Sequence, residues 1–371
     1  MFVIGTRPEA IKMAPVVLAC ARSDDVAQPL LCTTGQHRDM LAPVLDYFGL
    51  AVDEDLSLMQ AGQSLPDLTA RCLHALDVLI ERQRPDCIVV QGDTTTAMTA
   101  ALAGFYRRVP VVHVEAGLRT GDLQAPWPEE LNRRIATLTA SVHCAPTQRA
   151  ADVLAAEGVS PQRIHVTGNT VVDALLWTVD RERANAQHWQ AQFPYLGAAP
   201  LVLVTGHRRE NFGAGIEQLC RAISELAERF PDARFVYPVH LNPNVHEPVH
   251  QMLSGRSNVH LVAPVPYPGF VWLMDRATLI LTDSGGIQEE APSLGVPVLV
   301  LRDTTERPEA LETGVVDLVG TCVERIVERA TALLDGPGRQ SPESGPGSNP
   351  FGDGQAAGRI TDLIASRAWT A

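Results

Sequence analysis

Short apolar runs that end in glycine-containing turns alternate with helical segments along the whole chain of 371 residues. The run from Phe2 to Ile4 leads into such a turn, and the same order recurs after residues 28–34, 87–91, 111–114, 201–205 and 279–282. A long helix is expected from about Leu65 to Arg84, with Ser64 and Asp67 in capping-box spacing at its start. Strands that alternate with helices form parallel sheets with helices on both faces, because each parallel connection must cross over the sheet. The pattern predicts an α/β protein with two Rossmann-like, doubly wound domains, whose ligands lie beyond the carboxyl ends of the strands.

The stretch from Leu279 to Glu290 shows what one of these turns could bind. Asp283 or Ser284 can cap the helix that follows the strand, and the two glycines after them leave the backbone N–H groups open to a ligand. Those N–H groups and the helix dipole favour an anion such as a phosphate. Glu290 lies one turn further on and could accept two hydroxyls of a ribose. An ordinary strand-to-helix turn has a similar sequence, so both interpretations stay open for this stretch alone.

The length of the chain exceeds that of a typical single core and predicts two domains. The first Rossmann-like domain is expected over residues 1–168, and a connecting helix and linker over 169–200. The second is expected over 201–355, ending in a loop rich in glycine, proline and serine over 335–355. A C-terminal helix over 356–371 could pack back on the first domain.

Composition excludes several classes of partner. The formal net charge of −13 argues against general binding to nucleic acid or to an anionic membrane. The sequence contains no apolar run of membrane-spanning length and no signal segment, so a cytoplasmic protein is expected. Seven cysteines without a Cys-x-x-Cys pair are typical of small buried residues in a reducing compartment.

Acidic residues recur where the predicted strands end. Asp93 follows one strand and Glu115 follows the next, so both belong at the carboxyl-end edge of the first sheet. Glu129 and Glu130 open a helix after a proline-rich loop. Acids in a first helical turn are favourable by themselves, so at least one of this pair has a structural explanation, while the other could face a ligand.

Two cations, Arg7 and Lys12, lie near the N-terminal end of the first predicted helix. Positive charge at this end opposes the helix dipole, and a bound anion would account for both residues. Solvated surface charge is the alternative.

The segment from His246 to His250 satisfies the zinc-protease pattern His-Glu-x-x-His. That site needs both histidines on one face of a helix, a third ligand and an open metal position. Because Pro243 precedes the segment and Pro248 interrupts it, we expect the start of a surface helix and no metal site.

In combination, seven motifs resemble the non-hydrolysing UDP-N-acetylglucosamine 2-epimerases of bacteria. They span nearly the whole chain and are Gly5–Lys12, Gly92–Thr95, His113–Arg119, Pro126–Glu130, Thr205–Glu210, Leu279–Glu290 and Thr304–Glu309. The resemblance implies the architecture of B-type glycosyltransferases, with two Rossmann-like domains facing across a cleft, and a homodimer. It also implies interconversion of UDP-N-acetylglucosamine and UDP-N-acetylmannosamine through UDP and 2-acetamidoglucal, without a cofactor or metal, to supply polysaccharide synthesis.

The resemblance further implies roles for individual residues. The residues implied to bind the substrate are Arg7 and Lys12 on the diphosphate, Ser284, Gly285 and Gly286 on the phosphates, Glu290 on the ribose, Arg307 on the nucleotide side and Phe270 on the uracil. His207 would support departure of the diphosphate. The implied acid–base carboxylates are Asp93, Glu115 and Glu129.

Three alternatives share this fold or ligand: a B-type glycosyltransferase, a hydrolysing epimerase and a non-catalytic UDP-sugar-binding module. Three carboxylates in the first domain favour proton transfer over sugar transfer to an acceptor. The assignment of base and acid among them stays open. Activation by substrate at a second site near Gln36 and His37 also stays open.

Overall fold

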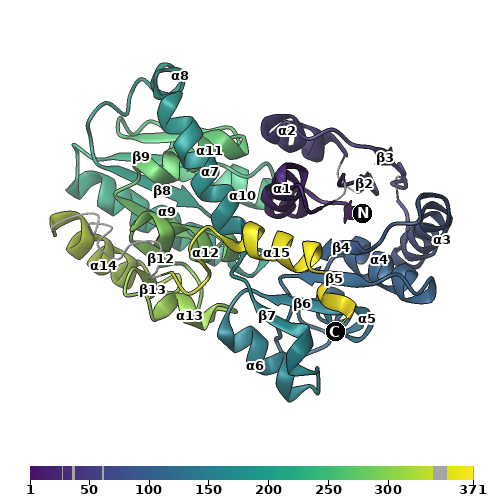
Figure 1. Cartoon of the computed structure of the whole chain (residues 1–371). Coiled ribbons are helices and arrows are strands. Elements are labelled where there is room, and N and C mark those ends of the chain that lie inside the picture. The colour runs from purple at the N-terminus through teal and green to yellow at the C-terminus, as the bar shows by residue number, and fades with distance from the viewer. Residues whose placement is uncertain (27, 36–37, 61, 337–348, 371) are drawn as a thin grey trace. The chain divides into compact units, whose positions relative to one another are not determined.

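The computed structural model describes residues 1–26, 28–35, 38–60, 62–336 and 349–370. The chain divides into two compact units (Figure 1), one formed by Met1–Ala174 with Phe351–Ala371 and the other by Leu175–Pro350. Helix α7 (Thr170–Ala184) spans this division, within the segment predicted to connect the domains. Of the predicted loop over 335–355, residues 337–348 lie outside the described residues.

The described part of the first unit contains a parallel sheet of seven strands in the order β3-β2-β1-β4-β5-β6-β7. The strands are β1 (Phe2–Ile4), β2 (Leu31–Thr33), β3 (Glu54–Asp55), β4 (Ile88–Gln91), β5 (Val111–Val114), β6 (Val142–Ala145) and β7 (Ile164–Val166). The strand predicted over 28–34 is shorter than expected, because pairing with β1 involves only residues 31–33. The short strand β3 follows no apolar run and was not predicted.

Helices connect these strands, and their ends follow local capping chemistry. They are α1 (Arg7–Arg22), α2 (Arg38–Phe48), α3 (Leu65–Gln83), α4 (Thr95–Tyr106), α5 (Glu129–Thr139) and α6 (Gln148–Ala156). Helix α3 begins where its capping box predicts, since the Ser64 hydroxyl accepts a hydrogen bond from the Asp67 N–H group at 3.3 Å.

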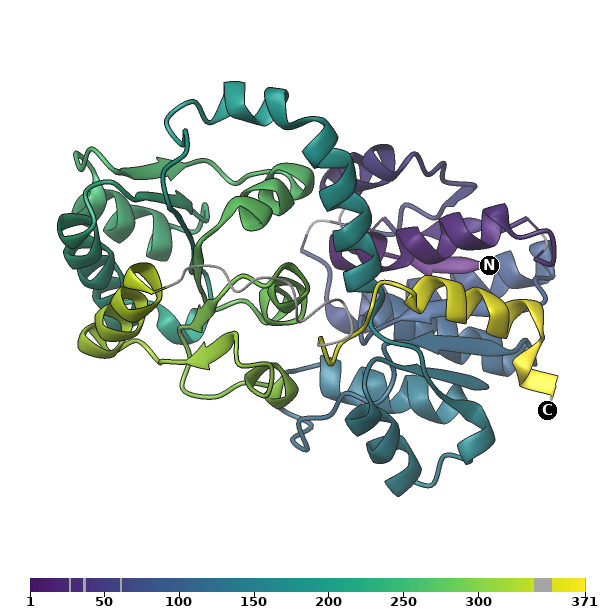
Figure 2. The same ribbon diagram turned by 60° about the vertical axis from the view of Figure 1, so that its left-hand side comes forward.

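The C-terminal helix α15 (Ala356–Ala365) packs on the first unit beside α1 (Figure 2), where Cys20 Sγ and Thr361 Oγ1 lie 3.5 Å apart. We predicted this helix over residues 356–371. It ends earlier because Arg367 has a φ of 51°, in the left-handed region that terminates helices.

The second unit repeats the same plan. Its described part contains six parallel strands in the order β10-β9-β8-β11-β12-β13. The strands are β8 (Leu201–Thr205), β9 (Arg234–Pro238), β10 (Val259–Val262), β11 (Leu279–Thr282), β12 (Val298–Val300) and β13 (Val316–Leu318). Its helices are α8 (Ala186–Gln192), α9 (Ala214–Arg229), α10 (Pro243–Leu253), α11 (Tyr267–Arg276), α12 (Gly285–Leu294), α13 (Pro308–Leu311) and α14 (Val323–Asp335).

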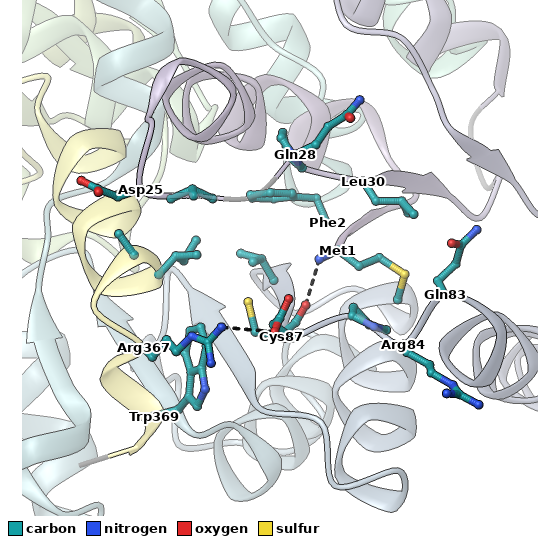
Figure 3. Close-up of a pocket in the computed structure, with 17 residues that line it drawn as sticks. Met1, Phe2, Asp25, Gln28, Leu30, Gln83, Arg84, Cys87, Arg367 and Trp369 are labelled. Carbon is teal, nitrogen blue, oxygen red and sulfur yellow. Dashed lines mark hydrogen bonds and ion pairs between the residues drawn. The ribbon is translucent and has the colours of Figure 1, made fainter.

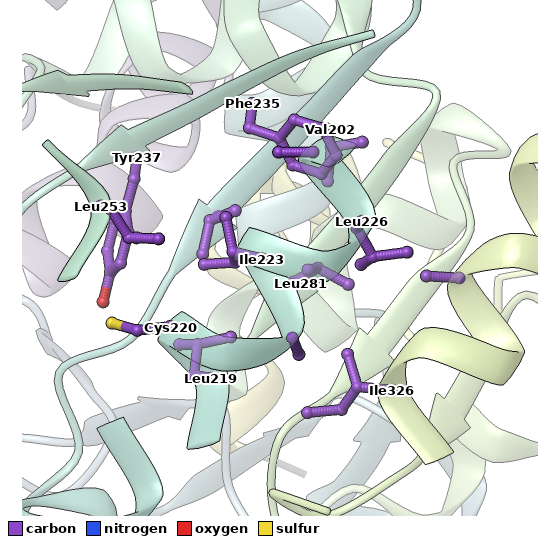
Figure 4. Close-up of a cluster of buried hydrophobic side chains, with 14 of the residues drawn as sticks. Val202, Leu219, Cys220, Ile223, Leu226, Phe235, Tyr237, Leu253, Leu281 and Ile326 are labelled. Carbon is purple, nitrogen blue, oxygen red and sulfur yellow. The ribbon is translucent and has the colours of Figure 1, made fainter. Parts of the chain in front are cut away.

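A continuous apolar core holds the second sheet to its helices (Figure 4). Val202, Phe235 and Leu281 project from neighbouring strands, and Ile223 on α9 and Ile326 on α14 cover them. All five side chains are fully buried. Burial of one such side chain stabilises the fold by about 1.5 to 3 kcal/mol, so this layer fixes the strands whose ends carry the candidate site.

The strand order locates the expected ligand positions. In both sheets, the first strand of the unit lies between the second and the fourth, so the direction of winding reverses between β1 and β4 and again between β8 and β11. Ligands of doubly wound sheets bind beyond the carboxyl ends of the strands at such reversals. The prediction of two Rossmann-like domains is thus confirmed, and the turns after these strands become the candidate ligand positions of each unit.

Six of the seven cysteines are buried, as predicted, and Cys322 is exposed; all seven are free thiols within the described residues. No helix in the described ranges combines the length and apolar character needed to cross a membrane.

Two buried histidines make the first unit sensitive to acid. His113 on β5 and His143 on β6 are neighbours in the sheet, and neither ring nitrogen of His143 has a hydrogen-bond partner among the described residues. Burial lowers the pKa of His143 to about 3 and that of His113 to about 4. Below the unfolded-state pKa of about 6.5, the unfolded chain therefore binds more protons than the folded chain, and stability falls as the pH drops.

We predict that His143→Leu reduces this acid sensitivity. One such histidine contributes a slope of about 1.4 kcal/mol per pH unit between pH 6.5 and its folded-state pKa. Thermal unfolding at pH 7.5 and pH 5 should therefore show a smaller loss of Tm for the variant than for the wild type. His246→Leu, at an exposed position, is the matched control and should leave the loss unchanged. An equal loss in all three proteins would contradict the assignment.

Candidate functional site

The turns after β4 and β5 bring two of the predicted carboxylates to one edge of the first sheet. Gln91 pairs with Val114 in the parallel register, and the Gly92 N–H group donates to the Val114 carbonyl at 2.9 Å. Asp93 and Glu115 follow directly after these residues. The edge where the sheet reverses its winding is therefore acidic.

Glu115 lies in a tight network with a cation. Lys12 on α1 donates to both of its carboxylate oxygens, at 2.7 Å to Oε1 and 2.6 Å to Oε2. The side-chain amide of Gln91 donates to the same carboxylate. Glu115 also has a φ of 62°, in the left-handed region that costs a non-glycine residue about 1 to 3 kcal/mol. The resemblance implies a diphosphate contact for Lys12, whereas the structure pairs its ammonium group with Glu115.

Helix α5 holds the turn that carries Asp93. Arg133 donates to the Asp93 carboxylate, and the side-chain amide of Asn132 donates to the Asp93 carbonyl at 3.0 Å. On the other side of the turn, His113 Nε2 lies 2.8 Å from the carbonyl oxygen of Gly92. Side chain and backbone of Asp93 are thus both fixed from a helix about 40 residues further along the chain.

The two acids at the start of α5 have different environments. Glu130 is fully buried and accepts hydrogen bonds from the Thr120 N–H group at 3.1 Å and from Arg134 at 3.0 Å. Glu129, the first residue of the helix, is half-buried. Glu130 is therefore the acid with the structural explanation, and Glu129 stays the candidate for contact with a ligand.

A buried carboxylate joins the first turn of α1 to the turn after β4. Glu9 Oε2 accepts from the backbone N–H groups of Gly5 at 3.0 Å and Thr6 at 2.7 Å, and Glu9 Oε1 accepts from the Thr94 hydroxyl at 2.7 Å. Burial raises the pKa of Glu9, while these hydrogen bonds favour its ionised form. Arg7 is exposed at the start of the same helix.

In the second unit, Asp283 organises the turn after β8. Its Oδ2 atom accepts from the backbone N–H groups of His207 and Arg208, each at 2.9 Å, and from the Asn211 amide at 3.1 Å. Its Oδ1 atom lies 3.4 Å from Nδ1 of His207. We predicted Asp283 or Ser284 as a side-chain cap of α12. Ser284 occupies the cap position without a side-chain cap hydrogen bond, and Asp283 braces the neighbouring turn instead.

The N-terminus of α12 faces two guanidinium groups. A Cβ atom added at Gly285 would lie 3.0 Å from Nη1 of Arg307 and 3.4 Å from Nη2 of Arg208. Arg307 is held in place by Glu289 at 2.6 Å and by Glu306 at 2.8 Å. A helix N-terminus beside two forked cations suits a phosphate group, and the absence of a side chain at Gly285 makes room for them.

Two further predicted residues lie on neighbouring helices of this unit. A Cβ atom added at Gly286 would lie 3.8 Å from Oε2 of Glu290, so that carboxylate reaches the first turn of α12. Phe270 is half-buried on α11, which contacts both α12 and β8. The residues expected from the resemblance in this unit therefore gather around β8 and β11.

The segment His246–His250 lies inside helix α10, one turn further from the helix start than we expected. The two imidazole rings lie side by side, with centroids 4.2 Å apart. Within the described residues, no group of three or more potential metal ligands occurs. Gln36 and His37, considered for substrate activation, lie outside the described residues.

A pocket of about 270 Å³ lies at the opposite edge of the first sheet, at the amino ends of β1 and β4 (Figure 3). Phe2, Cys87, Arg367 and Trp369 line it, and the amino group of Met1 donates to the Cys87 carbonyl at 2.8 Å. Since ligands of doubly wound sheets bind at the carboxyl ends of the strands, this pocket does not belong to the candidate site.

Comparison with known proteins places the chain in a family. Residues 7–365 match the family model described as UDP-N-acetylglucosamine 2-epimerase. The chain belongs to this family. The UDP-N-acetylglucosamine 2-epimerase of Escherichia coli (strain K12) is 51% identical over 366 residues, which cover 98% of this chain and 97% of that relative.

Solved structures of the epimerase family share the fold. The enzyme from Neisseria meningitidis, bound to UDP-GlcNAc, is 44% identical with a TM-score of 0.89, and the match covers 98% of this chain and 99% of that one. The Methanocaldococcus jannaschii epimerase in complex with UDP-GlcNAc and UDP is 31% identical with a TM-score of 0.80. This match also covers 98% of this chain and 99% of that one.

Several residues of the candidate site carried no separate signal in the sequence. The sequence indicates only that Gln91 ends a strand and that Asn132 and Arg133 belong to an amphipathic helix. Arg208 lies in a recognised motif, but its approach to Gly285 depends on the pairing of β8 with β11. These contacts depend on tertiary structure, which spacing along the chain does not reveal.

Proposed function

We propose that this chain catalyses the reversible epimerisation of UDP-N-acetylglucosamine at C2 to UDP-N-acetylmannosamine, as a non-hydrolysing isomerase. The observation that carries the proposal is the pair of carboxylates, Asp93 and Glu115, at adjacent strand ends of the first unit, each bound to a cation. A phosphate-compatible helix N-terminus with two guanidinium groups in the second unit supports it. The relatives described above are named UDP-N-acetylglucosamine 2-epimerases, and two of their structures contain UDP-GlcNAc.

The chemistry requires groups that move a proton and groups that stabilise the charge on the diphosphate of the leaving UDP. In the elimination step, the C1–O bond breaks and its electron pair goes to the β-phosphate oxygen, while the C2 proton passes to a carboxylate and a C1–C2 double bond forms. UDP and 2-acetamidoglucal result. Re-addition of UDP, with protonation on the opposite face of C2, completes the inversion. Proton-handling groups on both faces explain the use of more than one carboxylate.

We assign proton transfer to Asp93, Glu115 and Glu129, each of which could contribute roughly 100- to 10,000-fold. Lys12 balances the charge of Glu115. In the second unit, His207, Arg307 and the turn of Ser284 to Gly286 stabilise charge on the leaving diphosphate, a contribution of about 3 to 4 kcal/mol for one good donor. Arg7 would also contact the diphosphate, Glu290 the ribose and Phe270 the uracil. We further propose that the enzyme acts as a homodimer in the cytoplasm.

Proton NMR of UDP-N-acetylglucosamine with the enzyme in D₂O tests the proposal. We expect the C2–H signal to disappear as deuterium enters, and signals of UDP-N-acetylmannosamine to grow in. Release of free N-acetylmannosamine would identify a hydrolysing enzyme. An unchanged C2–H signal after long incubation would rule out both forms of epimerisation.

A further inference from the structure

Arg133 lies between two carboxylates at the acidic edge of the first sheet. One of its terminal nitrogens donates to Asp93, and the other lies 3.4 Å from Oε2 of Glu130. The side chain of Arg133 is only 12% exposed. A cation this deeply placed needs a counterion at all times, because desolvation without one is costly.

The position of Glu130 supplies that counterion independently of Asp93. When Asp93 is ionised, Arg133 can pair with both acids. When Asp93 holds a proton it is neutral, and Glu130 remains within reach of the guanidinium group. Arg134 also binds Glu130, at 3.0 Å, so Glu130 is fixed in place from the exposed side. The arrangement lets Asp93 change its protonation state without leaving a buried charge unpaired.

The planar guanidinium group also restricts how the Asp93 carboxylate can point. Asn132 holds the backbone carbonyl of the same residue at 3.0 Å, so two successive residues of α5 fix one residue of the turn. Because one terminal nitrogen of Arg133 contacts Asp93 and the other faces Glu130, the two carboxylates together fix the plane of the guanidinium group.

We propose that Arg133 is a positioning residue that orients the Asp93 carboxylate for proton transfer at the sugar. While Asp93 holds the proton, Glu130 balances the charge of Arg133. The inference rests on the proposed function, because it assumes that Asp93 exchanges a proton with substrate. It assigns no substrate contact to Arg133.

The test compares Arg133→Ala, Arg133→Lys and the control Arg134→Gln in the deuterium-exchange assay. Arg134 is the adjacent cation on α5 and binds Glu130 without an observed contact to Asp93. We expect Arg133→Ala to lower kcat about 100-fold, as for a misplaced catalytic group, with KM and UDP affinity nearly unchanged. Arg133→Lys should recover part of the rate, and added guanidinium ion should partly rescue Arg133→Ala. Arg134→Gln should stay within about fivefold of wild type, as for a partly exposed ion pair.

The inference would be overturned if Arg133→Ala kept wild-type activity, or if Arg134→Gln lost as much kcat as Arg133→Ala. The proposed function would stand in either case. A loss in Arg133→Ala that neither lysine nor guanidinium ion relieves would also overturn it, since a merely structural role predicts that result. Absence of exchange in the wild-type chain would remove the proposed function and this inference with it.

Discussion

Replacement of Asp93 by asparagine should abolish most C2 exchange and leave UDP binding intact. Asparagine keeps the shape of the side chain but cannot take up a proton at neutral pH, and the loss of one well-placed acid–base group lowers rates by roughly 100- to 10,000-fold. UDP affinity should persist because most of the groups assigned to the diphosphate, namely His207, Arg307 and the turn of Ser284 to Gly286, belong to the other unit. Calorimetry with UDP and the exchange assay measure the two quantities separately.

Asp46→Asn is the matched control for this variant, because Asp46 is an exposed carboxylate on α2 in the same unit. It should exchange at the wild-type rate. Near-normal exchange in Asp93→Asn would remove Asp93 from the assigned role. Loss of both exchange and UDP binding would show that the variant has damaged the fold, and circular dichroism of the two variants would then reveal the difference.

Asp283→Ala should lower both stability and UDP affinity. The change removes the acceptor of two backbone N–H groups and of the Asn211 amide in a fully buried environment. A buried donor without a partner costs about 1 to 3 kcal/mol, so a loss of about 3 kcal/mol or more in the free energy of unfolding is expected. Because the turn that carries His207 and Arg208 loses its brace, UDP affinity should also fall by at least about tenfold, as expected for about 1.4 kcal/mol of lost binding free energy.

Denaturant unfolding and calorimetry with UDP measure these effects. Asp232→Asn, at an exposed position of the same unit, should change neither quantity. If Asp283→Ala bound UDP with wild-type affinity, the turn after β8 would not depend on this carboxylate, and the placement of His207 and Arg208 near the phosphate would need another explanation.

Local patterns predicted much of this fold. Apolar runs such as Val111–Val114 and Leu201–Thr205 are completely buried strands, and their boundaries match the prediction. The capping box at Ser64 located a helix start to the residue. Short strands were less predictable, because the extent of β2 depends on how many of its residues pair with β1.

The site was predictable in its motifs but not in its contacts. The sequence indicates that Asp283 precedes a helix, and capping is the local use of an aspartate there. In the structure, Asp283 instead accepts hydrogen bonds from the backbone of the turn after β8. This contact requires that β8 and β11 pair in the sheet. In the same way, the pairing of Lys12 with Glu115 joins residues 103 positions apart. Such contacts follow from strand order, and the Rossmann order became visible only in the structure.

In the proposed reaction, carboxylates of the first unit move a proton at C2 while the C1–O bond to UDP breaks and re-forms. The most direct measurement extends the deuterium-exchange assay to substrate that carries ¹⁸O in the bridge between C1 and the β-phosphate. If the bond breaks, the released β-phosphate can rotate before re-addition, and ³¹P NMR should show ¹⁸O moving to non-bridging positions while C2 acquires deuterium. Exchange at C2 with the label retained in the bridge would show that the C1–O bond stays intact and would contradict the elimination of UDP.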